Sequence, residues 1–169
     1  MTTSTEKEIF VQLIQENKGI VFKVCNSYCN NKDDRDDLSQ EIVYNLWKSF
    51  SSYNQGFKFS TWMYRIALNV AISFYRKETR SAPRVPFSES LIVWDESPPN
   101  DSDAENNLRL LLRFISELKE IDKSIMLLYL DDKSYKEIAE ITGITETNVA
   151  TKINRIKDKL KSNFLTSKK

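Results

Sequence analysis

Histidine is absent from this 169-residue chain, and glycine, cysteine and proline are scarce, with three, two and four copies. Without histidine, and without a glycine-rich phosphate loop or a recognisable nucleophile, the sequence offers no enzyme active site. The scarcity of glycine and proline, beside abundant leucine, isoleucine, lysine and glutamate, favours helices over strands and turns. We therefore expect an all-α protein that is not an enzyme, built as one domain or as two small helical domains.

Long apolar runs are missing too, since none approaches the roughly 20 residues that cross a bilayer. The N-terminus lacks the basic-then-apolar order of a signal peptide, so we expect a soluble, cytoplasmic protein with no membrane insertion. Cys25 and Cys29 are one helical turn apart, but no histidine or third cysteine completes a metal site, and buried free thiols are expected. The aspartates of "DDRDD", residues 33–37, spread around a turn rather than converge, so we expect no metal ion and no other cofactor.

Charge is balanced overall, with a formal net charge of +1, but it is unevenly distributed along the chain. Residues 88–106 hold six acidic residues and no basic one, whereas residues 152–169 hold seven basic residues and one acidic residue. All four prolines fall within residues 81–106, where no apolar periodicity is visible. These features predict an acidic linker over 81–106, between domains at 1–80 and 107–169, and a basic, DNA-facing C-terminal end.

Apolar residues recur at helical spacing in three stretches of the first domain, namely 5–29, 35–50 and 60–80. A capping box at Thr5 and Glu8 and a cap at Ser60 are expected to begin the first and third of these helices. The predicted buried stripes are Ile9, Leu13, Ile20 and Val24, then Leu38, Ile42, Leu46 and Phe50, and finally Trp62, Ile66, Val70 and Phe74 with Met63 and Ala67.

Four helices are predicted in the second domain, within residues 104–118, 119–131, 134–143 and 145–164. Ser134 and Glu137 form a capping box that opens the third of them, and Gly143 supplies the left-handed turn that ends it. Thr145 caps the next helix, and Ile144 plugs the corner between the two. The buried stripe of that last helix is Val149, Ile153, Ile156 and Leu160. This arrangement predicts a helix-turn-helix.

The opposite face of the last helix is polar and basic, with Asn148, Thr151, Lys152, Arg155 and Lys159. Lysine and arginine can reach phosphates or guanine edges, and asparagine and threonine can reach base edges or methyl groups. The pattern therefore predicts that this helix enters a major groove. An ordinary pair of helices with a solvated basic face is the alternative interpretation.

A second polar face lies on the predicted helix 60–80, where Arg65, Asn69, Ser73 and Arg76 recur at helical spacing. Just before it, four aromatic residues surround Lys58, namely Tyr53, Phe57, Phe59 and Trp62. Rings beside cations suit the binding of unstacked bases, because each ring offers about 1–3 kcal/mol of stacking per base. A place in the core is the alternative for these rings, and we favour it for Trp62 but not for Tyr53, which lies in the loop.

The segments "DDLSQEIVYNLW", "FSTWMYRIALNVAISFYRK" and "SYKEIAEITGITETNVATKINRIKDKL", in this order, resemble the sigma factors of bacterial RNA polymerase. Specifically, they resemble the extracytoplasmic-function (ECF) group of the sigma-70 family, over nearly everything from Ile9 to Phe164. The resemblance implies a region 2 three-helix bundle and a region 4 helix-turn-helix bundle joined by a flexible linker. It implies a sigma factor that binds core RNA polymerase and directs promoter-specific initiation of transcription. Its partners would be core polymerase, double-stranded and melted promoter DNA and, as often in this group, an anti-sigma protein.

Site residues follow from the same resemblance. The acidic helix that grips the coiled-coil of the largest polymerase subunit is matched by Asp36, Asp37, Leu38, Gln40 and Glu41. Tyr53 falls where the family captures a flipped base of the minus-ten element, and Asn69 where it reads the duplex edge. The same downstream site would include Lys58 and Phe59 in the loop, with Arg65, Arg76 and Lys77 on phosphates. The minus-thirty-five element would be read by Thr151, Asn154 and Arg155, with Lys152 at a frequent arginine position and Asn148 and Lys159 on the same face. Ala150 departs from the lysine or arginine that many relatives carry.

Other interpretations of these segments stay open. The chain could be a stand-alone helix-turn-helix regulator that binds an operator as a dimer. The acidic "DDRDD" could be only a solvated helix N-terminus, favoured there by the helix dipole. By resemblance the linker would thread through the polymerase, whereas from the sequence alone an unstructured spacer is an equal expectation.

Overall fold

The computed structural model describes residues 2–54, 56–81 and 103–167, and every regular element in these ranges is a helix. The chain divides into two compact units, Met1–Pro83 and Arg84–Lys169. No helix within the described ranges is long and apolar enough to cross a membrane. The expected all-α architecture is thus confirmed.

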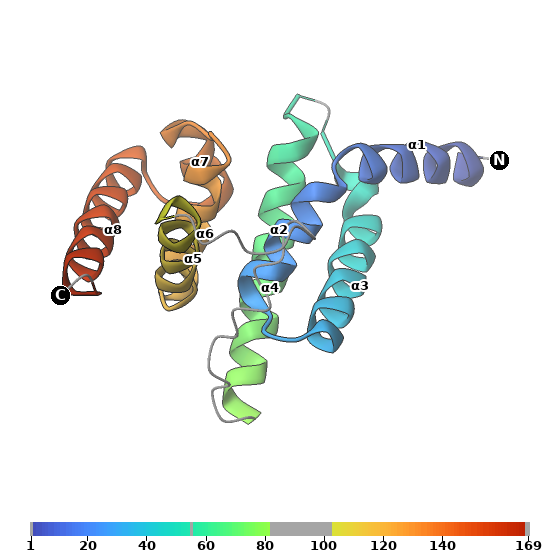
Figure 1. Cartoon of the computed structure of the whole chain (residues 1–169). Coiled ribbons are helices and arrows are strands. Elements are labelled where there is room, and N and C mark those ends of the chain that lie inside the picture. Colours follow the sequence, from blue (N-terminus) through green and yellow to red (C-terminus); the bar gives the residue numbers. More distant parts are fainter. Residues whose placement is uncertain (1, 55, 82–102, 168–169) are drawn as a thin grey trace. The chain divides into compact units, whose positions relative to one another are not determined.

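The first unit is a three-helix bundle with one additional helix. Its elements are α1 (Thr2–Glu16), α2 (Lys18–Tyr28), α3 (Lys32–Ser49), the short 3-10 helix η1 (Phe50–Ser52) and α4 (Phe59–Ser81). Helices α2, α3 and α4 pack against one another, and α1 extends away from them (Figure 1). Leu38, Ile42 and Leu46 of α3 are fully buried, as their spacing predicted, and Phe50 is half-buried at the start of η1.

The buried face of α4 is broader than the predicted stripe. Met63 and Ala67 are fully buried, with Tyr64, Leu68 and Ala71 beside them, because α4 packs against both α2 and α3. A helix covered on two sides buries two adjacent rows of side chains rather than one. The residues predicted to centre the stripe are therefore only half-buried at its edge, namely Trp62, Ile66, Val70 and Phe74. The helix begins at Phe59, so Ser60 lies in its first turn and is not its cap.

The predicted single helix over 5–29 is two helices, broken at Asn17. The backbone of Asn17 leaves the helical region (φ −118°, ψ 18°), and its side-chain Nδ2 donates to the Leu13 carbonyl at 2.9 Å. Asparagine competes in this way with the main chain for backbone hydrogen bonds. The break turns α1 so that Phe10 is buried, whereas Ile9, predicted to be buried, is 49% exposed. Because α1 begins at Thr2, Thr5 and Glu8 lie inside the helix and form no capping box.

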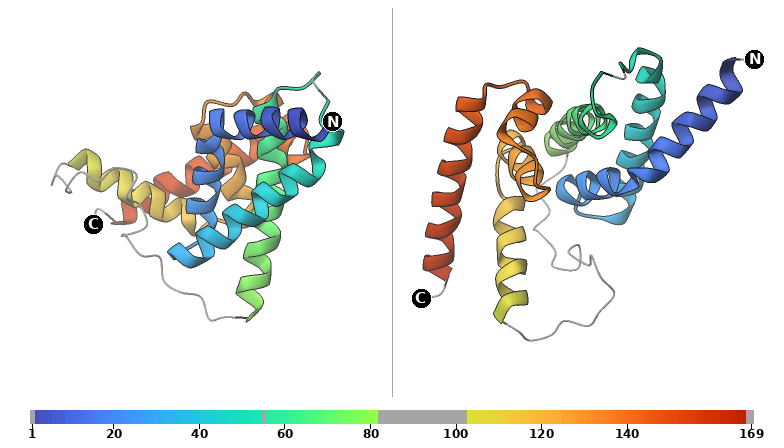
Figure 2. Two further views of the ribbon diagram at one scale, coloured as in Figure 1. Left: turned by 90° about the vertical axis from the view of Figure 1, so that its right-hand side faces the viewer. Right: turned by 90° about the horizontal axis from the view of Figure 1, so that it is seen from above.

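The second unit contains the four predicted helices. They are α5 (Asp103–Ser116), α6 (Glu120–Leu130), α7 (Tyr135–Thr142) and α8 (Glu146–Ser167). Helix α8 runs beside α5 and α6 (Figure 2), and a core forms between them from Ile115, Leu118, Met126, Ile156 and Leu160. Residues 103–106, expected in the linker, form the first turn of α5. Residues 82–102, which hold most of the predicted linker, lie outside the described ranges.

The helix-turn-helix formed by α7 and α8 has the local features that its sequence predicted. The Glu137 N–H donates to Ser134 Oγ at 3.1 Å, and the Ser134 N–H donates to Glu137 Oε2 at 3.2 Å, which completes the capping box. Gly143 has the left-handed φ of 78°. Thr145 Oγ1 accepts from the Asn148 N–H at 3.1 Å, as expected of a helix cap. The stripe Val149, Ile153, Ile156 and Leu160 is buried throughout.

Replacing Gly143 should test how strictly the turn needs glycine. A Cβ at Gly143 would meet no atom within 4 Å, so the left-handed backbone alone should make Gly143→Ala destabilising, by about 1–2 kcal/mol. Gly19, in α2, is the matched control because its backbone is helical and its Cβ position is also empty. Gly19→Ala should stabilise its helix by up to about 0.5–1 kcal/mol. Urea denaturation, monitored by circular dichroism, measures the free energy of unfolding of both variants. Changes of the same sign in the two variants would contradict the requirement for glycine at position 143.

Both cysteines are free and buried, as expected. Burial raises the pKa of the Cys25 thiol from 9.0 to about 12, an effect that nearby Arg35 partly offsets.

Because the thiolate is the reactive form, a thiol reagent at pH 8 should leave Cys25 unmodified until urea unfolds the chain. The folded protein holds this proton more tightly than the unfolded chain, so the free energy of unfolding should fall as pH rises from about 9 toward 12. A Cys25→Ala variant should lose this fall in the free energy of unfolding between pH 9 and 12. Rapid labelling of Cys25 in the native wild-type protein would contradict the raised pKa.

Candidate nucleic-acid and protein-binding surfaces

The outer face of α8 presents most of the residues predicted to read DNA. Those exposed are Asn148, Thr151, Asn154, Arg155 and Lys159. They stand opposite the buried stripe of the same helix, so the packing of α8 decides which side chains face outward. The Thr151 hydroxyl donates to the Thr147 carbonyl at 3.0 Å, which leaves its methyl group and its lone pairs on the exposed face. The face combines cations with amide and hydroxyl groups, the mixture that phosphate and base-edge contacts require.

Lys152 differs from its neighbours because it is paired within the protein. Its Nζ lies 3.4 Å from Asp122 Oδ1 on α6, and both side chains are partly shielded from solvent. Lys157, further along α8, holds its Nζ 4.5 Å above the ring centre of Tyr129. A hydrogen bond with Tyr129 raises the pKa of Lys157 above its ordinary value. Two lysines thus join α8 to α6, and the pairing of Lys152 with Asp122 makes the predicted DNA-facing side of α8 less positive than the sequence suggests.

A second exposed polar face runs along α4. Arg65, Asn69, Arg76 and Lys77 are all exposed, on the side of the helix away from Met63 and Ala67. Ser73, between Asn69 and Arg76 along the helix, is exposed as well. The structure therefore brings together on one helix surface the arginine, lysine and asparagine residues that the sequence assigned to DNA. Such a surface can hold a phosphate backbone while an amide side chain contacts a base edge.

The loop before α4 holds a cluster of packed rings centred on Tyr53. The Tyr53 ring centre lies 5.1 Å from that of Trp62, 5.4 Å from that of Phe59 and 6.3 Å from that of Phe50. The Tyr53 hydroxyl donates to the Phe57 carbonyl at 2.8 Å. Tyr53 and Phe59 are half-buried, whereas Lys58 is exposed. The ring predicted to capture a base is therefore engaged in packing against the ends of the two helices that flank its loop, η1 and α4.

The acidic start of α3 is capped and mostly exposed. Asn31 Oδ1 accepts from the Asp34 N–H at 2.8 Å, and Asp33 and Asp34 lie in the first turn, where the helix dipole favours them. The side chains predicted to contact polymerase are exposed at Asp36, Asp37, Gln40 and Glu41. Leu38 is fully buried, so it anchors α3 in the bundle and offers no surface to a partner. Within the described ranges, no three histidine, cysteine or acidic residues lie close enough to hold a metal ion.

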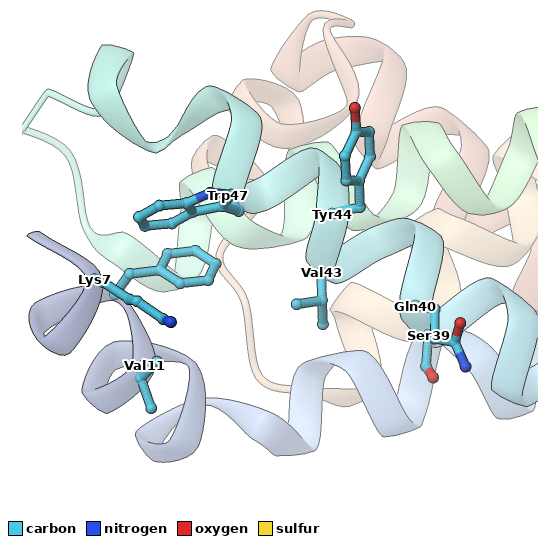
Figure 3. Close-up of a pocket in the computed structure, with 8 residues that line it drawn as sticks. Lys7, Val11, Ser39, Gln40, Val43, Tyr44 and Trp47 are labelled. Atoms are coloured by element: carbon cyan, nitrogen blue, oxygen red, sulfur yellow. The ribbon is translucent and has the colours of Figure 1, made fainter. Parts of the chain in front are cut away.

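An open apolar groove of about 510 Å³ lies between α1 and α3 (Figure 3). Phe10 and Val11 of α1 form one side, and Val43, Tyr44 and Trp47 of α3 form the other. Tyr44 is 63% exposed and Trp47 is 41% exposed, although Trp47 packs against Phe10 with ring centres 5.0 Å apart. Ser39 and Gln40 continue the groove toward the acidic start of α3.

The sequence analysis did not identify this groove. Its available signal was the presence of two large aromatic residues, Tyr44 and Trp47, outside the Leu38–Ile42–Leu46 stripe of the same helix. Large apolar side chains on the solvent side of an amphipathic helix often mark a binding surface. The contribution of α1 to the groove depends on the break at Asn17, which no spacing rule indicated.

Known proteins share this arrangement of two helical units. The family model for Sigma-70 region 2 matches residues 13–81, and the model for Sigma-70, region 4 matches residues 108–160. The ECF RNA polymerase sigma factor SigW of Bacillus subtilis (strain 168) is 28% identical over 166 residues, which cover 92% of this chain and 89% of SigW. The RNA polymerase sigma factor SigV of the same organism is 30% identical over 155 residues, which cover 89% of this chain and 88% of SigV.

Two solved structures have the same fold. The sigma factor RpoE from Bartonella quintana, solved in complex with the anti-sigma factor NepR, superposes with a TM-score of 0.69. It is 18% identical, and the match covers 92% of this chain and 96% of RpoE. CnrH, solved in complex with the cytosolic domain of CnrY, gives a TM-score of 0.67 at 18% identity, with 96% and 91% covered.

Region 2 followed by region 4 defines a sigma factor, a DNA-binding regulator that associates with core RNA polymerase and directs promoter-specific initiation of transcription. This chain belongs to the extracytoplasmic-function group of the sigma-70 family. The alternative of a stand-alone operator-binding dimer is not favoured, because region 2 occupies the first half of the chain.

Proposed function

We propose that the outer face of α8 reads the minus-thirty-five element from the major groove. The observation that carries this proposal is that Arg155 and four other predicted DNA contacts are exposed together, opposite a fully buried stripe. Arg155 would contact a phosphate or a guanine edge, and Asn148, Thr151 and Asn154 would contact base edges. Lys152 would contribute only when a phosphate replaces Asp122 as its partner.

The exposed face of α4 and the loop before it would act on the minus-ten element. Arg65, Arg76 and Lys77 would hold phosphates, and Asn69 would read the last paired position upstream of the melted segment. Melting would be driven by capture of unpaired bases, because a few kcal/mol gained from a bound base offsets the loss of its stacking. We assign the first unit, through α4, to this task, the second unit, from α5 onward, to upstream recognition and the residues between these two helices to the connection.

Core polymerase would bind along α3. Asp36, Asp37, Gln40 and Glu41 offer exposed carboxylates and an amide that would steer and orient docking. The neighbouring groove adds apolar area at Tyr44 and Trp47, the residue types that most often dominate binding energy at interfaces. Carboxylates at the edge and rings at the centre match the polar rim and apolar core of a protein interface.

Three further properties follow from this assignment. The chain would have no catalytic activity of its own, since its task is to position polymerase on DNA. It would work in the cytoplasm, where the bacterial polymerase transcribes. RpoE was solved with an anti-sigma factor, and we infer that this chain too is regulated by an anti-sigma protein that competes with polymerase.

Run-off transcription with core polymerase and genomic fragments tests the assignment of the two DNA-reading faces. Wild-type chain should produce discrete starts, and Asn69→Ala and Arg155→Ala should each reduce them by roughly 5- to 150-fold, the effect of about 1–3 kcal/mol per base contact. Lys161→Ala is the matched control for Arg155, because it removes an exposed positive charge that lies about 120° around α8 from Arg155. Equal losses of transcription starts for Arg155→Ala and Lys161→Ala would mean that the positive charge of α8, and not a specific contact by Arg155, supports promoter binding. DNA binding without core-dependent starts would overturn the proposed function.

Binding of labelled chain to core polymerase, measured by fluorescence anisotropy, tests the groove. Tyr44→Ala should weaken binding by about 30-fold or more, the size of an interface hot spot of about 2 kcal/mol. Because Tyr44 is 63% exposed, the thermal midpoint of the variant should not change. Phe22→Ala, which truncates a 51% exposed ring on α2 outside the groove, should bind as wild type does. Unchanged affinity for Tyr44→Ala would exclude the groove from the interface.

A further inference from the structure

Lys152 lies where the buried side and the outer side of α8 meet. Its neighbour Ile153 is fully buried, whereas Arg155, three positions further along, is exposed. Residues three or four positions apart are neighbours on a helix surface, so Lys152 lies between Asn148 and Arg155 at the edge of the outer face. Because lysine carries its charge on a flexible four-carbon chain, the ammonium group can reach either a neighbouring helix or a phosphate beside the outer face.

Asp122 is the acidic residue that holds Lys152 within the protein. It lies in the first turn of α6, and the Lys152 Nζ donates to its Oδ1 at 3.4 Å. Thirty positions separate the two residues, so the pair depends on the packing of α6 against α8. Met126 of α6 and Ile156 of α8 belong to the buried core that fixes this packing. The carboxylate of Asp122 is therefore held in place beside the DNA-facing side of α8.

The ion pair is weak enough to be exchanged for another partner. A distance of 3.4 Å is long for a hydrogen bond between two charged groups, which usually measures about 2.7–2.9 Å. The side chains of Lys152 and Asp122 are 39% and 26% exposed, so water reaches both. Pairs of this kind add little to the stability of a fold. A DNA phosphate can replace Asp122, but the gain is small because one anionic partner is exchanged for another.

The carboxylate of Asp122 also acts on DNA directly. A phosphate that reaches Lys152 comes close to this fixed negative charge and is repelled by it. Phosphate contacts contribute to the binding of any duplex, because they carry no sequence information. The effect of Asp122 should therefore be the same on a promoter and on an unrelated sequence.

We propose that Asp122 limits the affinity of α8 for DNA, by holding Lys152 and by opposing the phosphate beside it. This inference rests on the proposed function of α8. Base contacts by Arg155 and Thr151 would then supply a larger share of the upstream binding energy than the number of cations on α8 indicates. Weak phosphate binding also shortens the time that holoenzyme spends on non-promoter DNA, since affinity is set mostly by the dissociation rate.

The test uses holoenzyme and two labelled promoter duplexes that share a minus-ten element, one with an intact and one with a scrambled minus-thirty-five element. Fluorescence anisotropy measures the affinity for each duplex over a range of salt concentrations. Asp122→Asn should bind both duplexes up to about 5-fold more tightly, which corresponds to about 1 kcal/mol. The slope of log K against log salt should steepen by about 0.9, the effect of one additional phosphate contact.

Two further variants separate the ion pair from general charge. Glu140→Gln removes an exposed carboxylate from α7 and is the matched control, so it should leave the slope unchanged. Lys152→Ala should lower the affinity less than about twofold in the wild-type background. In the Asp122→Asn background it should remove the whole gain, because the two residues act on one contact. Both residues are partly exposed, and circular dichroism should show that every variant is folded.

Several outcomes would overturn the inference. Asp122→Asn could match Glu140→Gln in affinity and slope, or Lys152→Ala could cost the same factor in both backgrounds; either result would show that Asp122 does not restrain Lys152. A gain confined to the intact minus-thirty-five element would mean that Lys152 contacts a base edge instead of a phosphate. If wild-type holoenzyme binds the intact and scrambled duplexes equally, the proposed function of α8 fails, whereas the response of Asp122→Asn still decides the role of Asp122.

Discussion

Each helical surface proposed for binding, within the described residues, is the uncovered side of a helix whose other side builds a small core. In α8, burial of Val149, Ile153 and Ile156 fixes the rotation of the helix and thereby turns Arg155 outward. One residue corresponds to about 100° of rotation in an α-helix, so a slip of one position would replace the outer face almost entirely. The same holds for α3. Burial of Leu38 in the core turns its sequence neighbours Asp37 and Gln40 toward solvent, where they would meet polymerase. Function here depends on packing that fixes helix rotation more than on any single polar group.

The first unit adds a continuous series of ring contacts to this scheme. Phe10 packs on Trp47, Trp47 on Phe50, Phe50 on Tyr53 and Tyr53 on Trp62, with ring centres 5.0 to 6.4 Å apart. The series runs from the groove beside α3 to the loop before α4. Phe50 belongs to neither surface but touches residues of both. The apolar groove and the loop before α4 therefore share their packing, although their proposed ligands are a protein and a nucleic acid.

Local sequence rules predicted the second unit better than the first. Capping by Ser134 and Thr145 and the left-handed Gly143 depend on neighbours within four residues, and all three were correct. The break at Asn17 could not be predicted from spacing, because apolar residues continue on both sides of it. Which rows of α4 are buried depends on its contacts with both α2 and α3, and periodicity in one helix does not contain that information.

Site prediction was limited in the same way. Residue types and helical spacing placed Arg65, Asn69 and Arg155 on exposed faces. Whether a side chain on such a face is available depends on partners distant in sequence. The pairing of Lys152 with Asp122 is one example, since thirty positions separate the two residues. The role of Tyr53 stays a prediction. The rings that pack against it come from η1 and α4, and the sequence alone does not show which ring of this cluster is enclosed.

The attachment of α1 has a consequence for the stability of the groove that it lines. Among the described side chains of α1, Phe10 alone is fully buried, whereas Ile9 and Val11 are about half exposed. A helix attached through so little buried area opens at a lower free energy than the bundle, as a separate cooperative unit in hydrogen exchange. Opening of α1 would remove one wall of the groove while leaving the buried stripe of α3 intact. The groove therefore exists as long as α1 is docked, and its population is set by a local equilibrium rather than by global unfolding.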